Sequence, residues 1–505
     1  MVPEQRVQPD HRLAALLDGV ATVATAQDVP ITGLCLRAQD TRPGDLFVAL
    51  AGLRTHGLRY LEQALARGAA AVVWEPASGI APPTAARTPV VAVESLARRL
   101  GLVADRFFGH PSRALTTIAV TGTDGKTSVS HFLAQALDKQ PGGPHCGLIG
   151  TLGYGLYGHL SPGVHTTPDA IRLHRELAIL RVQGAVAAVM EASSHALAQY
   201  RLDGVALDAA ILTNVTRDHL DYHQDAAAYA VAKRRLFEMP GLRHAVLNTD
   251  DALGIELVGA LSPAVNTIGY GIGEAKLPGA RCVRATEIEA TRAGLRFAVY
   301  TPKGRGVVQS RLLGRFNVSN LLAVLAALLA LDMPLPQALA RINQTRGAPG
   351  RMQAHGGNGR PLVVVDYAHT PAALAHALIA LREHCGGRLW CVFGCGGDRD
   401  AGKRPLMARV AQRHADEIIV TDDNPRGESP AGITADILAG FSRPDGVRVI
   451  HDRADAIACA VSAARAGDVV LVAGKGHEQV QIIGAEQRPF SDSQTVTALL
   501  GERRL

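Results

Sequence analysis

Short apolar, β-branched runs alternate with helix-like runs along most of this chain, and that alternation restricts its fold more than any other feature. In the middle of the chain, residues 115–120, 185–190, 209–213 and 245–248 have the composition of buried strands. Strands that alternate with helices favour a parallel sheet covered by helices on both faces. The sequence therefore predicts an α/β fold.

Two breaks divide this alternation into three blocks. The first block ends near Pro111, and a Gly/Pro-rich segment at 347–350 precedes the third block. A length of 505 residues suits about three domains at roughly 150 residues each. We therefore predict three domains, 1–111, 112–346 and 347–505.

Single elements are predicted within each block. In the first block we expect a strand at 45–50, a helix at 60–67 and a strand at 69–74. Residues 270–312 consist of short alternating runs, which predict an antiparallel insert in the second block. A strongly apolar helix is expected at 320–331. Strand candidates of the third block lie at 362–366, 389–393, 417–421, 447–450 and 468–473.

Composition and charge exclude several classes of protein. The chain is 47% hydrophobic and 19% charged, which excludes a disordered chain. The net charge of +6 is small and the signs are interspersed, so we expect no nucleic-acid partner. The longest apolar helix-like run, 321–331, is too short to span a bilayer, and the N-terminus lacks a signal-peptide apolar region. The seven cysteines form no CxxC pair, which indicates a reducing compartment. We expect a cytoplasmic monomer without membrane partners.

The strongest local motif is a glycine-rich loop, Thr121-Gly-Thr-Asp-Gly-Lys-Thr127, between a predicted strand and a predicted helix. Backbone N–H groups of such a loop, together with the helix N-terminus, form a cradle for phosphate. Lys126 would reach the β- and γ-phosphates, and the Thr127 hydroxyl would bind Mg²⁺. The alternative is an ordinary strand-to-helix turn, since only two residues separate the glycines.

Polar residues follow two more of the central strands. Glu191 follows 185–190, and His219 lies in the segment after 209–213. Ligands of open α/β sheets gather at the carboxyl ends of strands, so both side chains are candidates for a metal site. Mg²⁺ prefers oxygen ligands, which would make His219 an unusual one. Hydrogen-bonded loop residues are the alternative. By residue type alone, Lys233 belongs to a solvated basic face.

The third block also carries polar groups where its strands end. Arg399 and Arg426 could hold a carboxylate, while Asp423 and Glu478 could hold an ammonium group. A site with both signs of charge suits an amino acid. The alternative is a set of turn residues that form surface salt bridges. Arg351, after the Gly/Pro segment, would be a surface residue or would reach toward the second block.

Seven motifs in order resemble the Mur ligase family over essentially the whole chain. The resemblance is closest to the branch that adds diaminopimelate, because Asp423-Asn-Pro-Arg426 has the form typical of that branch. The seven segments are Thr121–Thr127, Glu191–His195, Asn214–His223, Gly314–Asn320, Asp366–Pro371, Asp423–Arg426 and Gly474–Glu478.

The resemblance implies a fold and a set of nucleotide and metal residues. The fold would be a three-domain α/β architecture with a central P-loop parallel-sheet ATPase domain and a Rossmann-like C-terminal domain. Lys233 would be carbamylated to N6-carboxylysine, which replaces the interpretation of a solvated lysine. The catalytic residues would be Lys126, Glu191, His219 and Lys233, and the metal site would combine Thr127, Glu191, His219 and Lys233. ATP would contact Gly122, Thr123, Asp124, Gly125, Lys126, Thr127, Ser128, Asn317 and Arg351.

The resemblance also implies two substrate sites. The N-terminal domain would bind the UDP part of UDP-N-acetylmuramoyl-L-alanyl-D-glutamate, and the C-terminal domain would bind meso-2,6-diaminopimelate. The UDP-muramoyl-dipeptide would contact Thr166, Thr167, Ser193, Gln199 and Arg201. Diaminopimelate would contact Arg399, Asp423, Asn424, Arg426, Gly474 and Glu478.

The implied activity is ATP-dependent amide-bond formation through an acyl phosphate, with Mg²⁺ as cofactor and ATP as cosubstrate, in peptidoglycan precursor synthesis. Arg37-Ala38-Gln39 and Asp124 depart from the usual family pattern. One alternative is a lysine-adding or folylpolyglutamate-type ligase. Another is a non-catalytic paralogue that binds UDP-sugar or nucleotide.

Overall fold

A computed structural model of the chain describes residues 11–52, 55–83, 87–138, 142–216, 218, 220–274, 281–357 and 359–501. Two compact units result from its internal contacts. The first comprises Met1–Lys126, Leu137–Leu247 and Asp251–Thr267, and the second comprises Thr127–Ala136, Asn248–Asp250 and Ile268–Leu505. These units do not follow the three predicted domains, so the boundaries 1–111, 112–346 and 347–505 stay a prediction. The predicted α/β class is confirmed.

The first unit begins with a four-stranded parallel sheet in the order β3-β4-β5-β6. Leu46 and Val48 pack on one face and Phe47 and Ala49 on the other, because successive residues of a strand point to opposite faces. Ala178 of a later helix shares the first of these two cores. The elements are β1 (His11–Arg12), α1 (Leu13–Leu16), β2 (Pro30–Ile31), β3 (Gly33–Cys35), β4 (Asp45–Ala49), α2 (Leu61–Ala66), β5 (Ala71–Trp74), β6 (Val90–Ala92) and α3 (Leu96–Phe107).

A larger sheet of the first unit has the strand order β10-β9-β8-β11-β7-β12-β13. Its five strands β8, β11, β7, β12 and β13 are parallel, and β9 and β10 add an antiparallel edge. The predicted central strands are confirmed to within one residue at each end. The strands are β7 (Thr116–Thr121), β8 (His145–Gly150), β9 (Gly153–Leu156), β10 (His159–Ser161), β11 (Ala185–Glu191), β12 (Ala209–Leu212) and β13 (His244–Asn248).

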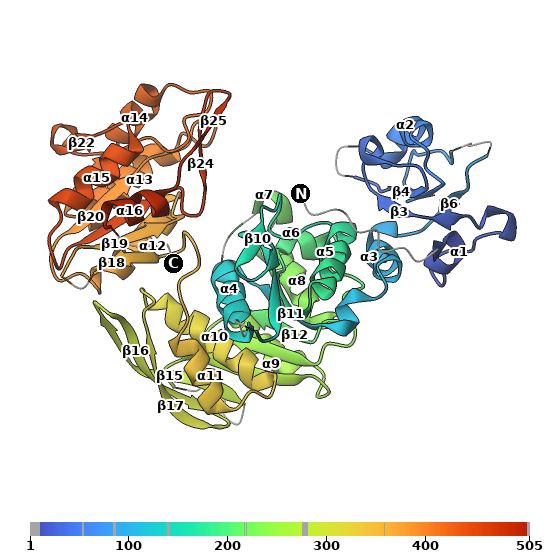
Figure 1. The fold of residues 1–505 in the computed structure, drawn as a ribbon, viewed down its shortest axis with the longest axis horizontal. Coiled ribbons are helices and arrows are strands. Elements are labelled where there is room, and N and C mark those ends of the chain that lie inside the picture. The colour runs from blue at the N-terminus through green and yellow to red at the C-terminus, as the bar shows by residue number, and fades with distance from the viewer. Residues whose placement is uncertain are drawn as a thin grey trace. The chain divides into compact units, whose positions relative to one another are not determined.

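Helices surround these strands, as Figure 1 shows for α5, α6 and α8. Among the described residues, four of them begin at side-chain caps that accept a backbone N–H of the first turn: Asp169 before α5, Ser193 before α6, Asp225 before α8 and Asp251 before α9. The helices of the first unit are α5 (Ala170–Val182), α6 (Ser194–Ala198), α7 (Leu220–His223), α8 (Ala226–Arg234) and α9 (Ala252–Ala260). Helix α4 (Lys126–Leu137) has Lys126 and Leu137 in the first unit and Thr127–Ala136 in the second.

In the second unit, β14 (Asn266–Ile272) pairs in parallel with β15 (Cys282–Thr291). β15, β16 (Gly294–Thr301) and β17 (Gly304–Ser310) are antiparallel, as the sequence of 270–312 predicts. The apolar helix α10 (Phe316–Ala330) begins four residues before its expected start at Asn320. Asn320 lies inside the helix, where it is buried and donates to Asn317. Helix α11 covers Leu335–Asn343.

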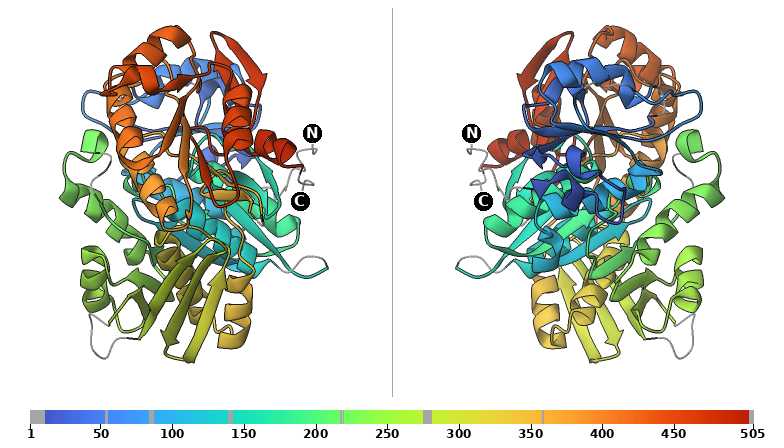
Figure 2. Two further views of the ribbon diagram at one scale, coloured as in Figure 1. Left: turned by 90° about the vertical axis from the view of Figure 1, so that its left-hand side faces the viewer. Right: turned by 90° about the vertical axis from the view of Figure 1, so that its right-hand side faces the viewer.

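The rest of the second unit is a six-stranded sheet in the order β18-β19-β23-β20-β21-β22, parallel except for β18. Helices α12, α13 and α14 cover one face, while α15 and α16 cover the other. In Figure 2 the strands of this sheet lie between these two sets of helices. The strands are β18 (Gln353–Gly356), β19 (Leu362–Asp366), β20 (Leu389–Phe393), β21 (Glu417–Val420), β22 (Arg448–Val449) and β23 (Val469–Ala473).

The helices of this part are α12 (Pro371–Arg382), α13 (Lys403–His414), α14 (Pro430–Leu438), α15 (Arg453–Ala463) and α16 (Asp492–Leu499). A hairpin of β24 (Val480–Ile483) and β25 (Glu486–Pro489) lies outside the sheet and was not expected from the sequence. Among the residues that the structure describes, every helix is too short or too polar to cross a lipid bilayer.

Candidate functional site

The glycine-rich loop joins β7 to α4 at the carboxyl end of the first unit's larger sheet. Gly122 and Gly125 have φ angles of 150° and 80°, which L-residues with a side chain rarely adopt. A Cβ atom on Gly122 would overlap the hydroxyl of Thr213, which follows the neighbouring strand β12. That hydroxyl donates to the Asp124 carbonyl at 2.6 Å, and the Asn214 side chain accepts from the Asp124 N–H at 3.0 Å. The segment after β12 therefore fixes the shape of the loop.

Lys126 opens α4 and folds back over this loop. Its Nζ donates to the carbonyls of Gly122 and Thr123, both at 2.9 Å. An ammonium group that is held against the loop lies beside the backbone N–H groups that form a phosphate cradle. The position predicted for Lys126 is thus compatible with the neutralisation of a bound phosphate.

Lys233, on α8, lies beside the same loop. Its side chain is only 1% exposed, and its Nζ donates to the Gly122 carbonyl at 2.6 Å and lies 4.4 Å from the centre of the Tyr229 ring. Burial, and after it the charge of Lys126, lowers the pKa of Lys233 to about 6. Lys233 therefore does not belong to a solvated basic face. At neutral pH its amine is mostly uncharged and nucleophilic.

Glu191 ends β11, the strand on the other side of β7. The carboxylate is 2% exposed and accepts hydrogen bonds from the Thr151 N–H at 2.7 Å and the Thr151 hydroxyl at 3.3 Å. A Cβ atom on Gly150 would overlap the Glu191 carboxylate, so the glycine leaves room for that carboxylate in its present position. A buried carboxylate therefore ends one of the two strands beside the phosphate loop.

The five residues expected at the UDP-muramoyl-dipeptide are hydrogen-bonded to Thr151, to the Glu191 backbone or to one another. Thr166 contacts the Thr151 hydroxyl at 3.0 Å, and the Thr167 hydroxyl donates to the Glu191 carbonyl at 2.6 Å. Thr167 also accepts the N–H of Ser193 at 3.1 Å. The structure thus places three of the five residues around the end of β11.

Arg201 and Gln199 complete this group. The Arg201 guanidinium donates to the Thr167 carbonyl at 2.8 Å and to the Gln199 side-chain oxygen at 2.7 and 3.0 Å. Gln199 in turn donates to the hydroxyl of Tyr222 at 3.0 Å. Tyr222 stacks on His195 with ring centres 4.2 Å apart. All of these residues lie in the first unit, so the group is formed within one compact body.

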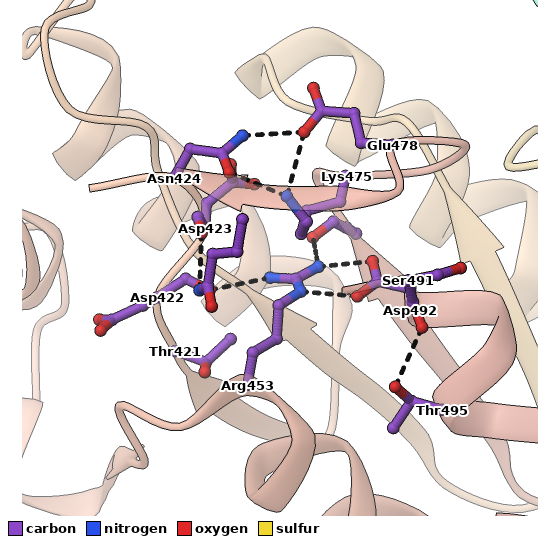
Figure 3. Close-up of polar contacts among 12 residues, drawn as sticks. Thr421, Asp422, Asp423, Asn424, Arg453, Lys475, Glu478, Ser491, Asp492 and Thr495 are labelled. Atoms are coloured by element: carbon purple, nitrogen blue, oxygen red, sulfur yellow. Dashed lines mark hydrogen bonds and ion pairs between the residues drawn. The ribbon is translucent and has the colours of Figure 1, made fainter. Parts of the chain in front are cut away.

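In the second unit, the predicted amino-acid residues gather at the carboxyl ends of β21 and β23. Asn424 donates to Glu478 at 2.8 Å, although the two residues are 54 positions apart (Figure 3). Gly474, with φ of 120°, lies so close to Asp423 that a Cβ atom would be 2.5 Å from its carboxylate. Burial raises the pKa of Asp423, and the positive charge of Arg453 acts against this rise.

Two arginines lie beside this group. Arg426 has a left-handed backbone with φ of 52°, and its backbone exchanges hydrogen bonds with Ile482 and Gly484 of the β24–β25 hairpin. Its guanidinium donates to the Gly397 carbonyl at 3.0 Å. A Cβ atom on Gly396 would lie 2.7 Å from the Arg426 guanidinium and 3.8 Å from Arg399. Arg426 therefore reaches the loop that follows β20, and the exposed Arg399 is part of that loop.

Two further residues were expected at the nucleotide. Asn317 is buried in the first turn of α10 and donates to the Leu313 carbonyl at 2.8 Å. The Arg351 guanidinium lies 4.8 Å from the centre of the Tyr367 ring. Within the described part of the chain, the buried Nε of Arg351 has no hydrogen-bond partner, which leaves it available to a ligand.

The structure describes only some of the residues of the predicted metal site. His219 lies outside the described residues, and Thr127 stands in the first turn of α4. Within the described ranges, no group of three or more His, Cys, Asp or Glu side chains is placed to hold a metal ion.

Models of three protein families match consecutive parts of the chain. Residues 30–108 match the Mur ligase family catalytic domain, residues 120–328 the Mur ligase middle domain, and residues 350–476 the Mur ligase glutamate ligase domain. A UDP-N-acetylmuramoyl-L-alanyl-D-glutamate–2,6-diaminopimelate ligase from Alkalilimnicola ehrlichii is 51% identical over 498 residues, which is 97% of this chain and 99% of the relative. The chain belongs to the Mur ligase family.

Other Mur ligases agree with this result. The ligase of the same name from Pseudomonas aeruginosa is 50% identical over 467 residues, covering 92% of this chain and 94% of that protein. A solved structure of a UDP-N-acetylmuramoyl-L-alanyl-D-glutamate–2,6-diaminopimelate ligase superposes with a TM-score of 0.70 at 37% identity, over 94% of this chain and 95% of that one. The predicted α/β Mur ligase architecture is therefore confirmed.

Some residues of this Mur ligase site were not predicted from the sequence. Thr151, Tyr222 and Tyr229 contact Glu191, Gln199 and Lys233 respectively, and none of them is in the expected set. Tyr222 lies inside the motif Asn214–His223, whereas Thr151 and Tyr229 lie outside the motifs. Lys475 lies inside the motif Gly474–Glu478, which was a usable signal. Arg453 offered no sequence signal, because its partners are 20 to 39 residues away. The ligand-binding roles of the predicted residues stay predictions.

Proposed function

We propose that this chain is the ATP-dependent ligase that joins meso-2,6-diaminopimelate to UDP-N-acetylmuramoyl-L-alanyl-D-glutamate in peptidoglycan precursor synthesis. The observation that carries the proposal is 51% identity over 97% of the chain to a relative named for this reaction. The joint presence of carboxylates and arginines where β20, β21 and β23 end supports an amino acid as the incoming group.

The reaction has two displacement steps. The D-glutamyl γ-carboxylate attacks the γ-phosphorus of ATP, which gives an acyl phosphate and ADP. The amine of diaminopimelate then attacks the acyl carbon, phosphate leaves, and the amine loses a proton. Lys126 stabilises the charge on the transferred phosphoryl group, because its ammonium already lies against the phosphate loop.

Mg²⁺ would be held by Thr127, Glu191, His219 and a modified Lys233, and it would neutralise phosphate oxygens. The Lys233 environment fits the modification: the amine is buried, and a pKa of about 6 leaves most of it uncharged at neutral pH. Its attack on CO₂ releases one proton and gives N6-carboxylysine. The carbamate nitrogen keeps one N–H, so the hydrogen bond to the Gly122 carbonyl survives.

The substrate roles follow the two groups of contacts. Thr166, Thr167 and Ser193, with Gln199 and Arg201, would position the UDP-muramoyl-dipeptide so that its γ-carboxylate meets the phosphate loop. Arg399 and Arg426 would bind the distal carboxylate of diaminopimelate, which lysine lacks. Asp423, Asn424, Gly474 and Glu478 would contact the amino-acid end. Residues 1–111, 112–346 and 347–505 would be the UDP, ATP and amino-acid domains.

The test is ADP release with the UDP-muramoyl-dipeptide and a panel of amines. We expect release that requires both the dipeptide and meso-diaminopimelate, and that Lys126→Ala abolishes. Equal release with L-lysine would instead indicate a lysine-adding ligase, and release with glutamate and a folate a folylpolyglutamate synthase. No amine-dependent release would indicate a paralogue that binds without ligation.

The lysine modification has its own measurement. After incubation with ¹³C-bicarbonate, the wild-type chain should show a carbamate carbon signal by NMR that Lys233→Ala lacks. An identical spectrum for the two chains would exclude carbamylation of Lys233 without affecting the assignment of the reaction.

A further inference from the structure

A second lysine of this ligase is buried completely and has no place in the proposed chemistry. Lys475 is 0% exposed and lies between β23 and the β24–β25 hairpin. Its Nζ donates to the Asn424 side-chain oxygen at 2.9 Å, to Glu478 Oε2 at 3.1 Å and to the Val480 carbonyl at 2.7 Å (Figure 3). A lysine ammonium has three donors and no acceptor. All three donors are therefore used by the protein, and none remains for a substrate.

These contacts fix the side chain of Asn424. Its oxygen accepts from Lys475 and from the Ile482 N–H at 3.0 Å, so its amide nitrogen must face Glu478. If the Asn424 amide were flipped, its NH₂ group would face the Lys475 ammonium and the Ile482 N–H, which are themselves donors. The ammonium and the Ile482 N–H together thus select one of the two orientations of a side chain that is 2% exposed.

The same ammonium acts on Glu478. Both Lys475 and Asn424 donate to Oε2 of that carboxylate. In Figure 3 the other carboxylate oxygen points away from both of them. One oxygen of the Glu478 carboxylate is therefore held by two hydrogen bonds within the protein, and the other oxygen faces away from these two donors.

A buried ion pair supports the backbone beneath these side chains. Arg453 is 1% exposed and binds Asp492 through two hydrogen bonds of 2.7 and 2.8 Å. The guanidinium also donates to the carbonyls of Ala473 at 3.0 Å and Asp422 at 3.4 Å. These are the residues immediately before Gly474 and Asp423, so one side chain connects the ends of β23 and β21.

We propose that Lys475 is a positioning residue for the incoming amino acid: it sets the orientation of Asn424 and Glu478, on strand ends that the Arg453–Asp492 pair holds together. The proposal rests on the proposed function, in which those two side chains contact diaminopimelate. Lys475 itself touches no substrate.

The experiment compares steady-state kinetics of the wild type and Lys475→Met, a substitution of similar length without donors. We expect KM for diaminopimelate to rise roughly 10- to 100-fold, as for the loss of charge-assisted hydrogen bonds, with KM for ATP and for the UDP-dipeptide unchanged. Lys303→Met is the matched control, since that lysine contacts Leu329 and Asp332 in another part of the chain. It should leave all three KM values at wild-type level.

A double-variant cycle separates positioning from folding support. In a Glu478→Gln background the charge that Lys475 balances is gone, so Lys475→Met should raise KM by a much smaller factor than in the wild type. Equal factors in both backgrounds would overturn the proposal. If Lys475→Met does not fold, Lys475→Gln, which keeps two amide donors, replaces it. We then expect a smaller rise in KM for diaminopimelate, again with KM for ATP and for the UDP-dipeptide unchanged.

The outcomes distinguish this proposal from the proposed function. A wild-type chain without diaminopimelate-dependent ADP release would overturn both. A responsive wild type whose Lys475→Met variant keeps KM for diaminopimelate within about twofold would overturn the positioning role alone.

Discussion

At the scale of single residues, the phosphate loop contains the carboxylate of Asp124, whose negative charge would repel a bound phosphate. The backbone of Asp124 is held by Thr213 and Asn214, so its exposed side chain projects from a fixed loop. A negative charge near phosphates is repulsive, although solvent screens it. We predict that Asp124→Asn lowers KM for ATP about threefold, measured by ADP release at low ionic strength. Glu62→Gln, which makes the same charge change on α2, should have no effect. A KM that rises in Asp124→Asn would contradict the prediction.

A buried histidine makes stability depend on pH. Burial lowers the pKa of His131, on α4, from 6.5 to about 4. The unfolded chain therefore binds a proton between these two values that the folded chain does not bind, so stability falls as the pH drops from about 7 toward 4. At pH 5 we expect this histidine to cost about 2 kcal/mol of unfolding free energy relative to pH 7.

The measurement for His131 is urea unfolding at pH 7 and pH 5. His131→Leu should lose less stability than the wild type between the two pH values, by about 2 kcal/mol. The same pH dependence in both chains would mean that other groups cause it.

At the scale of elements, the end of β23 illustrates how little space the amino-acid site leaves. Gly474→Ala would combine a strained φ of 120° with a Cβ atom 2.5 Å from the Asp423 carboxylate. We predict a loss of stability of about 2 kcal/mol or more and a KM for diaminopimelate raised about tenfold, measured by thermal unfolding and ADP release. Gly359→Ala, with a positive φ but open space around it, should show only the strain, about 1 kcal/mol. Equal effects of the two substitutions would refute the steric explanation.

The elements that the sequence predicts best are those buried on both faces. The strands at Leu362–Asp366 and Leu389–Phe393 have the expected bounds, because continuous β-branched or apolar runs leave few alternatives. The hairpin strand Glu486–Pro489 is exposed throughout, so no alternation of apolar residues marks it. The predicted start of α10 was too late because Asn320 suits an N-cap by residue type, whereas its burial beside Asn317 depends on tertiary contacts.

The residues of the candidate site also differ in how well the sequence predicts them. Motif residues such as Lys126 and Asn424 could be found because they lie where predicted strands end. The ion pair of Arg453 and Asp492 could not, since it depends on two helices that pack on the same face of the sheet. His219 remains a prediction of the sequence alone.

At the scale of the whole molecule, the first 111 residues and the larger sheet of the first unit are in close contact. Gly101 of α3 lies against the loop before β12, and a Cβ atom there would overlap the Asp203 carbonyl. Residues of α5 complete the apolar core beneath α3. The N-terminal sheet therefore depends on this contact for part of its core.

We predict that Gly101→Ala lowers the stability of the chain by about 2 kcal/mol, because α3 must move away from Asp203. Gly259→Ala, on α9 in open space, should instead raise stability by about 0.5 kcal/mol through its helix propensity. Urea unfolding measures both changes. A Gly101→Ala chain as stable as the wild type would show that the two sheets are not tightly packed at α3.

In the proposed reaction, a buried lysine, two strand ends and the three predicted domains would all serve one acyl transfer. Its distinctive step is the phosphorylation of the D-glutamyl γ-carboxylate before the amine attacks.

The most direct measurement uses UDP-N-acetylmuramoyl-L-alanyl-D-glutamate with ¹⁸O at both oxygens of its γ-carboxylate, supplied with ATP and meso-diaminopimelate. The product and the inorganic phosphate are then analysed by mass spectrometry. We predict one ¹⁸O atom in the phosphate for each amide bond formed, because the carboxylate oxygen that attacked phosphorus leaves with it. Amide product accompanied by unlabelled phosphate would contradict the acyl-phosphate account.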